Sequence, residues 1–237
     1  MSSWPDQALA LLDRAEKRHG GVARFTRVAS VRVRVEHLGG PLPRLKGLGK
    51  RWGAPTAAVV RPRARHVVFE GMTDGEAIFD DGGVRIVGRD GSVKDSPNHR
   101  PRVPRRGRWS AFDAVYFFGY ALVTYLSLPF VLRSCAYVGR RRWCDLDGVT
   151  VDFPPGYPTH SVRQSFFFDG EGLLRRHDYT ADVVGKWATG AHFSDAYIEA
   201  GGLWFATERH VRATLFGRPT PIPVLDARLG GFEVQEE

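Results

Sequence analysis

The chain has 237 residues, of which 43% are hydrophobic, and carries a formal net charge of +8. That apolar fraction is enough for a packed core and excludes global disorder. The length fits one large domain, and we expect a single β-rich domain over residues 1–237 with a helical insertion at about 109–132. With only two cysteines and no signal-peptide pattern at the N-terminus, the sequence favours a reducing, cytoplasmic location over a disulfide-linked secreted scaffold.

Much of the positive charge gathers on either side of one apolar segment. Five arginines lie between Arg100 and Arg108, and three more form the run Arg140–Arg142. Such clusters can bind the phosphates of nucleic acid or of anionic lipids, although they are also typical of a solvated surface. A membrane surface therefore stays open as a partner, whereas a nucleic-acid partner is disfavoured.

Near the N-terminus, residues 5–19 have the pattern of a short amphipathic helix. Ala8, Leu11, Leu12 and Ala15 recur at helical spacing, and two glycines at 20 and 21 end the pattern. One face of this helix is thus expected to pack on a larger element.

From residue 31 onward the hydrophobic period changes to two, which is typical of half-buried antiparallel strands. Gly- and Asp-containing turns separate the segments and favour an up-and-down order. Residues 94–108, rich in proline and charge, are expected to form an exposed loop. The predicted strands lie at about 31–38, 57–63, 66–71, 76–81, 84–89, 135–139, 148–153, 162–169, 173–180, 191–200, 203–213 and 224–234.

The segment from Trp109 to Leu132 contains a single charge, Asp113, and could be a membrane span, a core helix or the wall of an apolar pocket. Asp113, Pro129 and hydroxyl groups spread through its middle argue against a span, so no transmembrane segment is expected. A helix over Ser110–Leu126 that is apolar all round must be covered on every side. The sequence leaves open whether it is only core or also lines a ligand cavity.

The order of elements carries a family resemblance. It is a helix, several strands, a helical insertion and further strands, and it includes the stretches ALALLDRAEKRHGGVARFTRVASVRVRV and GLLRRHDYTADVVG. It resembles the lipoprotein-carrier fold of the LolA/LolB type and is similar to a group of uncharacterised bacterial proteins of that type.

The resemblance implies a mainly β (α+β) fold. It predicts a curved antiparallel half-barrel sheet covered by an N-terminal helix and an aromatic helix near 110–128, with a cavity that accepts an apolar ligand. The chain differs from the lipoprotein carriers in lacking a signal peptide and a lipobox cysteine. Ligand binding is therefore implied rather than lipoprotein transport.

The sharpest polar cluster is the run from Arg175 to Tyr179. On a regular strand Arg175, His177 and Tyr179 share one face, and Arg176 and Asp178 share the other. If the first three face inward, they would form the polar end of a cavity. An enzyme that uses His177 with Asp178 or Tyr179 is an open alternative, but no catalytic residue is assigned.

Eight histidines occur without a metal-binding spacing, so neither a metal nor a cofactor is predicted. The sequence favours non-enzymatic binding or carriage of an apolar or amphipathic, lipid-like small molecule. The predicted pocket residues on the aromatic helix are Phe112, Tyr116, Phe117 and Tyr120.

Overall fold

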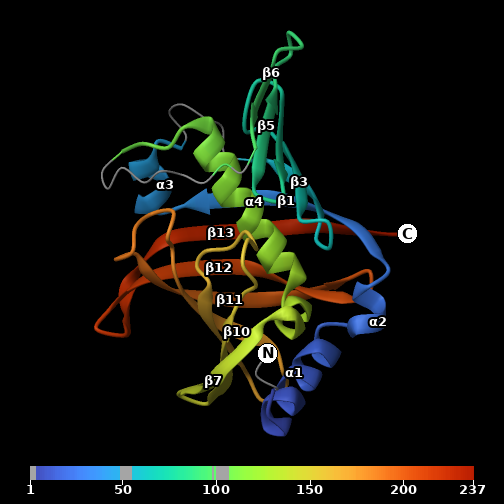
Figure 1. Cartoon of the computed structure of the whole chain (residues 1–237), viewed down its shortest axis with the longest axis vertical. Coiled ribbons are helices and arrows are strands. Elements are labelled where there is room, and N and C mark those ends of the chain that lie inside the picture. The colour runs from blue at the N-terminus through green and yellow to red at the C-terminus, as the bar shows by residue number, and fades with distance from the viewer. Residues whose placement is uncertain (1–3, 49–54, 98, 100–106) are drawn as a thin grey trace.

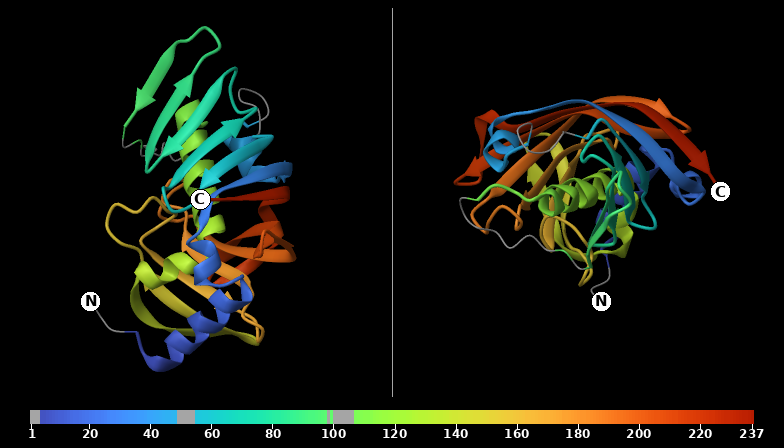
Figure 2. Two further views of the ribbon diagram at one scale, coloured as in Figure 1. Left: turned by 90° about the vertical axis from the view of Figure 1, so that its right-hand side faces the viewer. Right: turned by 90° about the horizontal axis from the view of Figure 1, so that it is seen from above.

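One antiparallel sheet forms the body of the molecule and curves around a long helix (Figures 1 and 2). The computed structural model describes residues 4–48, 55–97, 99 and 107–237. Thirteen strands in that part of the chain are hydrogen-bonded in the order β6-β5-β4-β3-β2-β1-β13-β12-β11-β10-β9-β8-β7. The predicted fold class, a mainly β curved half-barrel covered by helices, is confirmed.

The sheet consists of two meanders that meet where β1 pairs with β13. The first meander contains β1 (Val28–Gly39), β2 (Ala57–Arg61), β3 (His66–Glu70), β4 (Glu76–Asp80), β5 (Gly83–Val87) and β6 (Val93–Ser96). The second contains β7 (Ala136–Trp143), β8 (Leu146–Asp152), β9 (Arg163–Phe168), β10 (Leu174–Thr180), β11 (Thr189–Ala200), β12 (Leu203–Leu215) and β13 (Arg218–Glu236).

This topology makes β6 and β7 the two edge strands, and the chain between them has to pass from one edge of the sheet to the other. The helix α4 (Ala111–Ser127) and the 3₁₀ helix η1 (Phe130–Ser134) lie on that path. Figure 2 shows α4 inside the curve of the sheet, so the helical insertion covers the open side of the half-barrel.

Three shorter helices complete the fold. α1 (Asp6–Arg18) matches the helix predicted at 5–19, and α2 (Val22–Phe25) follows it directly. α3 (Pro41–Lys46) follows β1 and lies beside β13. The sequence did not predict α2 or α3, because four and six residues are too few to display a helical period.

Local sequence explains where α4 begins and ends. The hydroxyl of Ser110 accepts a hydrogen bond from the Asp113 backbone N–H, and the Asp113 carboxylate accepts one from the Ser110 N–H. At the other end, Pro129 disfavours helical geometry at the residue before it, and the helix ends at Ser127. The one charge in the apolar segment is therefore a helix cap.

Two apolar clusters fill the interior. The larger surrounds α4 and includes inward side chains of β1 to β5, β12 and β13. The smaller lies between α1, the segment around η1 and strands β8 to β10. The N-terminal helix and the aromatic helix thus cover different parts of the same concave face.

In the sequence, the two basic segments lie next to or on the edge strands of the sheet. The expected loop at 94–108 is partly wrong, because Val93–Ser96 forms the edge strand β6 and pairs with β5. Arg100, Arg102, Arg105 and Arg106 lie outside the described residues. The other basic run, Arg140–Arg142, lies on the edge strand β7, where Arg140 pairs with Asp147.

Candidate ligand-binding cavity

A cavity of about 270 Å³ opens between α3, α4 and the ends of β11, β12 and β13. Its lining is almost entirely carbon. Six of the apolar side chains that line it are Leu42, Leu45, Val184, Val211, Val224 and Leu225. Cavities of this size with apolar walls are typical of sites for small apolar molecules.

The turn after β1 places one wall of the cavity. Gly40 has a φ of 101°, and a Cβ atom there would lie 2.6 Å from the Val224 carbonyl oxygen, so the chain can turn this closely over β13 only with glycine. Pro41 begins α3 and Gly47 ends it in the left-handed conformation. Through this turn α3 covers the end of β13.

The segment between β10 and β11 forms the opposite wall. Its backbone is closed by a hydrogen bond of 2.8 Å from the Ala181 N–H to the Ala188 carbonyl, and Val183 and Val184 are buried. Two large apolar side chains among those lining the cavity remain in water: Leu45 is 73% exposed and Trp187 is 66% exposed. These two residues form its mouth.

The inner end of the cavity is formed by aromatic side chains. Phe117 and Tyr125 come from α4, and Tyr179 comes from β10. Burial raises the pKa of Tyr125 to about 12 and raises that of Tyr179 as well, so both are neutral phenols at ordinary pH. Each therefore offers an apolar ring and a hydroxyl group.

A buried polar cluster lies behind these rings. The Tyr120 hydroxyl and His160 Nδ1 are 3.1 Å apart, and the His160 ring stacks on Tyr179 with 3.7 Å between centroids. His177 Nε2 lies 2.5 Å from the Gln164 amide oxygen. These contacts fix the orientation of Tyr120 and Tyr179 inside the sheet.

The histidines of this cluster are neutral. Burial lowers the pKa of His160 to about 3, and burial lowers the pKa values of His177 and His192 well below their usual range. The neighbouring guanidinium of Arg209 lowers the last two further. At neutral pH these rings therefore carry no charge.

The four predicted residues on α4 do not meet in one cavity. Phe112 lies at the wall of a different groove, Tyr116 lines a third hollow beside His99, and Tyr120 is fully buried. Only Phe117 lines the apolar cavity. The reason is geometric: positions four residues apart on a helix differ by about 40° around its axis. Phe112, Tyr116 and Tyr120 therefore face different parts of the surrounding structure.

A β-bulge alters the faces predicted for β10. Leu174 pairs with Phe168, but Arg176 pairs with Phe167, so Arg175 is an extra residue in the strand. In a regular strand the side chains from Arg175 to Tyr179 would alternate between the two faces of the sheet. The bulge breaks this alternation at Arg175.

As a result, the three predicted polar residues separate. His177 and Tyr179 point into the interior, whereas Arg175 forms ion pairs with Asp169 at 2.7 Å and Asp195 at 3.6 Å. Arg175 is not among the residues that line the cavity, and of the three only Tyr179 is.

Of the two partners in the enzymatic alternative, the arrangement separates Asp178 from His177 but keeps Tyr179 beside it, with 4.7 Å between the ring centroids. Asp178 binds Arg176 through both carboxylate oxygens, at 2.6 and 2.8 Å, on the face opposite His177. Arg176 in turn lies over the rings of Trp143 and Phe167 on that outer face. His177 therefore has no carboxylate partner in Asp178.

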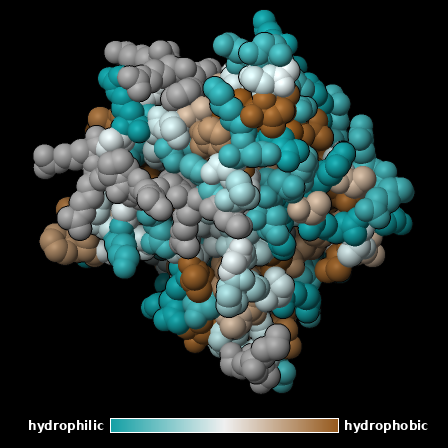
Figure 3. Space-filling model, turned by 45° about the horizontal axis from the view of Figure 1, so that its top comes forward, coloured by the Kyte–Doolittle hydropathy of each residue, from teal (hydrophilic) through white to brown (hydrophobic). Residues whose placement is uncertain are grey.

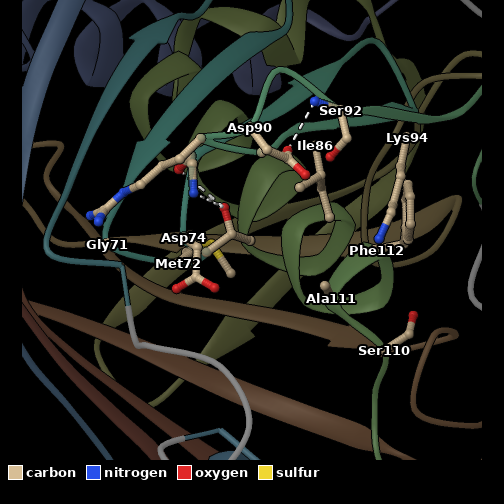
Figure 4. Close-up of a pocket in the computed structure, with 14 residues that line it drawn as sticks. Gly71, Met72, Asp74, Ile86, Asp90, Ser92, Lys94, Ser110, Ala111 and Phe112 are labelled. Atoms are coloured by element: carbon tan, nitrogen blue, oxygen red, sulfur yellow. Dashed lines mark hydrogen bonds between the residues drawn. The ribbon is translucent and has the colours of Figure 1, made fainter.

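A larger groove of about 940 Å³ lies at the other end of α4 (Figure 4). Phe112 forms part of its wall, but Asp74, Arg89, Asp90 and Lys94 also line it. The face in Figure 3 likewise carries its hydrophobic side chains as separate patches among hydrophilic ones. The charged lining makes this groove a poor match for an apolar ligand, despite its size.

Several residues of the apolar cavity were not predicted from the sequence, among them Leu45, Tyr125 and Trp187. Arg209 was not predicted either, although the sequence contains a signal for it. Inward positions of β12 are occupied by Leu203, Phe205 and Val211, and Arg209 occupies the same alternating register. An arginine at a strand position where the alternation calls for an apolar side chain is the sequence signal that identifies Arg209.

Similarity of this chain to known proteins is found among solved structures. No family model and no curated protein matches the chain. Among solved structures, it is similar to a LolA superfamily protein from Nitrosomonas europaea, with 8% identity and a TM-score of 0.48 over 97% of this chain and 94% of that one. It is also similar to a DUF1329 family protein from Desulfovibrio piger, with 13% identity and a TM-score of 0.46 over 97% and 94% of the two chains. At these identities and TM-scores the likeness carries no conclusion about function.

The described residues contain neither a membrane-spanning helix nor a cluster of metal-ligating side chains. None of the helices there has both the length and the apolarity needed to cross a membrane. Within the same ranges, no three His, Cys, Asp or Glu side chains are grouped so that they could hold a metal ion.

Proposed function

We propose that the cavity between α3, α4 and strands β11 to β13 binds an apolar or amphipathic small molecule. The observation that carries this proposal is the combination of an almost wholly apolar lining with a mouth formed by the exposed side chains of Leu45 and Trp187. Apolar groups left in water at the edge of an apolar cavity are covered when a ligand binds, which lowers the free energy of the complex.

The size of the cavity suits one short or partly inserted hydrocarbon chain. Burial of about eight methylene groups contributes roughly 6 kcal/mol to binding. Part of that is offset by the entropy lost on association. Tyr125 and Tyr179 at the inner end can donate or accept hydrogen bonds, which would suit an amphipathic molecule better than a pure hydrocarbon.

A glycine in the wall allows a direct test. Gly190 lines the cavity, and a Cβ atom there would lie 3.5 Å from Val211 Cγ1 and 3.6 Å from the Tyr179 ring, which is ordinary contact. The substitution Gly190→Leu therefore fills cavity volume without strain at Cβ. Because it adds apolar contact, we expect it to leave the free energy of unfolding unchanged or raise it.

The matched control is Gly139→Leu on β7, where a Cβ atom meets nothing within 4 Å. Binding is measured with a long-chain conjugated polyene alcohol whose fluorescence rises in apolar surroundings. The proposal predicts saturable binding by the wild type and by Gly139→Leu, and at least about tenfold weaker binding by Gly190→Leu. Equal binding by all three proteins, or none by the wild type, would contradict it.

A further inference from the structure

Arg209 is a buried cation without an anionic partner among the described residues. It lies on β12 beneath α4 and is 5% exposed. Its partners are the Ser194 hydroxyl at 3.4 Å and the face of the Tyr125 ring, 4.3 Å from its guanidinium carbon. Its Nε has no hydrogen-bond partner, and among the described residues no ion pair joins the guanidinium to a carboxylate.

Arg176 provides an internal comparison. It is equally buried, at 2% exposure, on the opposite face of the sheet. There the carboxylate of Asp178 neutralises it with two hydrogen bonds, in addition to contacts with aromatic rings. Nη1 of Arg176 has no hydrogen-bond partner, as Nε of Arg209 has none, but a carboxylate neutralises the charge of Arg176. Arg209 has only a hydroxyl and an aromatic ring.

The surroundings of Arg209 increase the contrast. It lines a small inner pocket of about 40 Å³ whose other walls are apolar, including Leu38, Phe118, Leu122 and Leu229. A cation removed from water in such a place is unfavourable unless an anion approaches it. Burial accordingly lowers the pKa of Arg209 from its usual value.

The inner pocket adjoins the cavity described above. Both are lined by Phe117, Tyr125 and Leu225, so the two hollows share a wall that has Arg209 on its inner side. Tyr125 lies at the junction, with its ring over the guanidinium on one side and the cavity on the other.

We propose that Arg209 binds the anionic head group of a single-chain amphiphile whose hydrocarbon tail occupies the apolar cavity. This inference rests on the proposed function and specifies the ligand class: a carboxylate, or another compact anion such as a phosphate monoester, at the inner end of the chain. A guanidinium binds either group through paired hydrogen bonds, and the Nε that lacks a partner is one of the donors.

The test compares two probes of the same chain length, a long-chain conjugated polyene fatty acid and the corresponding alcohol. We expect the wild type to bind the acid more tightly than the alcohol, by on the order of tenfold to a hundredfold, as for a charge-assisted hydrogen bond. Arg209→Met is expected to remove this preference, because it weakens binding of the acid more than binding of the alcohol. An apolar side chain of similar volume is usually tolerated where a buried charge is replaced.

Two further variants complete the design. Arg212→Met makes the same substitution three residues along β12, where the guanidinium lies over Phe193 on the outer face, and should keep the preference. Arg209→Lys keeps a positive charge and should retain part of it, which gives a result even if Arg209→Met fails to fold. Competition by a long-chain alkyl phosphate tests whether a phosphate head group binds as well as a carboxylate. Competition by acetate and by inorganic phosphate tests whether a free anion without a hydrocarbon tail binds at the same place.

The outcomes are distinct. A wild-type preference for the acid that Arg209→Met abolishes and Arg212→Met preserves supports the inference. Equal binding of acid and alcohol by the wild type, or an unchanged preference in Arg209→Met, overturns it while the proposed cavity stands. Binding of neither probe by the wild type overturns both. Displacement by acetate or inorganic phosphate as effective as by the alkyl phosphate also overturns the inference, because the tail would then contribute nothing.

Discussion

Gly119 of α4 lies directly against the ring of Phe79 on β4: a Cβ atom at position 119 would be 2.2 Å from Phe79 Cγ. Non-bonded carbon atoms do not approach so closely, so helix and sheet can lie this near each other only because residue 119 has no side chain. The contact holds α4 on the first meander and thereby sets the position of Phe117, which lines the cavity.

The first prediction concerns this contact. Gly119→Ala gains about 1 kcal/mol in helix propensity. The clash with Phe79 costs more, because overpacking of a core costs roughly 1–3 kcal/mol and occasionally more than that. We expect a net decrease in the free energy of unfolding, measured by urea denaturation. Adding Phe79→Leu to Gly119→Ala should recover part of the loss, and strictly additive effects would contradict a direct clash.

The second prediction concerns the link between α1 and η1. Arg133 Nε lies 2.9 Å from both carboxylate oxygens of Glu16, whose side chain is 4% exposed. Arg133→Met leaves that carboxylate buried without its partner and should lower the free energy of unfolding by about 1–3 kcal/mol. Arg133 also binds Asp13, which is 64% exposed; Asp13→Asn should cost less than about 1 kcal/mol. Similar losses for both variants, measured by urea denaturation, would contradict this account.

The third prediction is a loss of stability in acid. The pKa of His160 is about 3 in the folded protein and 6.5 in an unfolded chain, so the unfolded state binds the extra proton between those values. The stabilisation is complete above pH 6.5 and is lost as the pH falls toward 3. At about pH 5 this one group lowers the free energy of unfolding by about 2 kcal/mol.

The double variant Tyr120→Phe/His160→Phe tests the assignment, because it removes the titrating ring without leaving the Tyr120 hydroxyl unpaired. Its free energy of unfolding should fall less than that of the wild type between about pH 7.5 and about pH 5. The remaining fall comes from other buried histidines, such as His177 and His192. An identical fall in both proteins would show that His160 already binds a proton in the folded state.

The fourth prediction uses Trp187 as a reporter at the mouth of the cavity. Its ring is 66% exposed in the free protein, so a bound ligand should shift its emission to shorter wavelength. Trp187→Phe should abolish this shift. Trp204→Phe, at the far end of β12 where the ring contacts Arg18, should not. A shift that persists in Trp187→Phe would place the ligand elsewhere.

Local sequence patterns were sufficient for most secondary structure. Alternation in β1, where Val31 and Val33 are buried and Arg34 is exposed, reflects a sheet with one covered face. The capped, aromatic helix and its end before Pro129 also follow from neighbouring residues. β6 escaped prediction because Val93–Ser96 is a charged edge strand, exposed along most of its length, and edge strands need no apolar face.

The residues of the candidate site depended on features that no local pattern contains. Whether Arg175 shares a face with His177 is decided by one bulge opposite Phe167 and Phe168, and a bulge depends on the partner strand. The positions of Phe112 and Tyr116 depend on which strands surround α4. The lining from α3 depends on a turn over Val224, which is distant in sequence.

The sequence by itself determined that this protein is mainly β with one aromatic helix inserted, because hydrophobic period and turn residues are local properties of the chain; the half-barrel shape was implied by the family resemblance. Only the tertiary structure decided that β1 pairs with β13, that α4 spans the open face, and that Leu45, Trp187 and Arg209 belong to one region. Those relationships join residues far apart in sequence, and they are fixed by which apolar faces bury one another when the whole sheet closes around the helix.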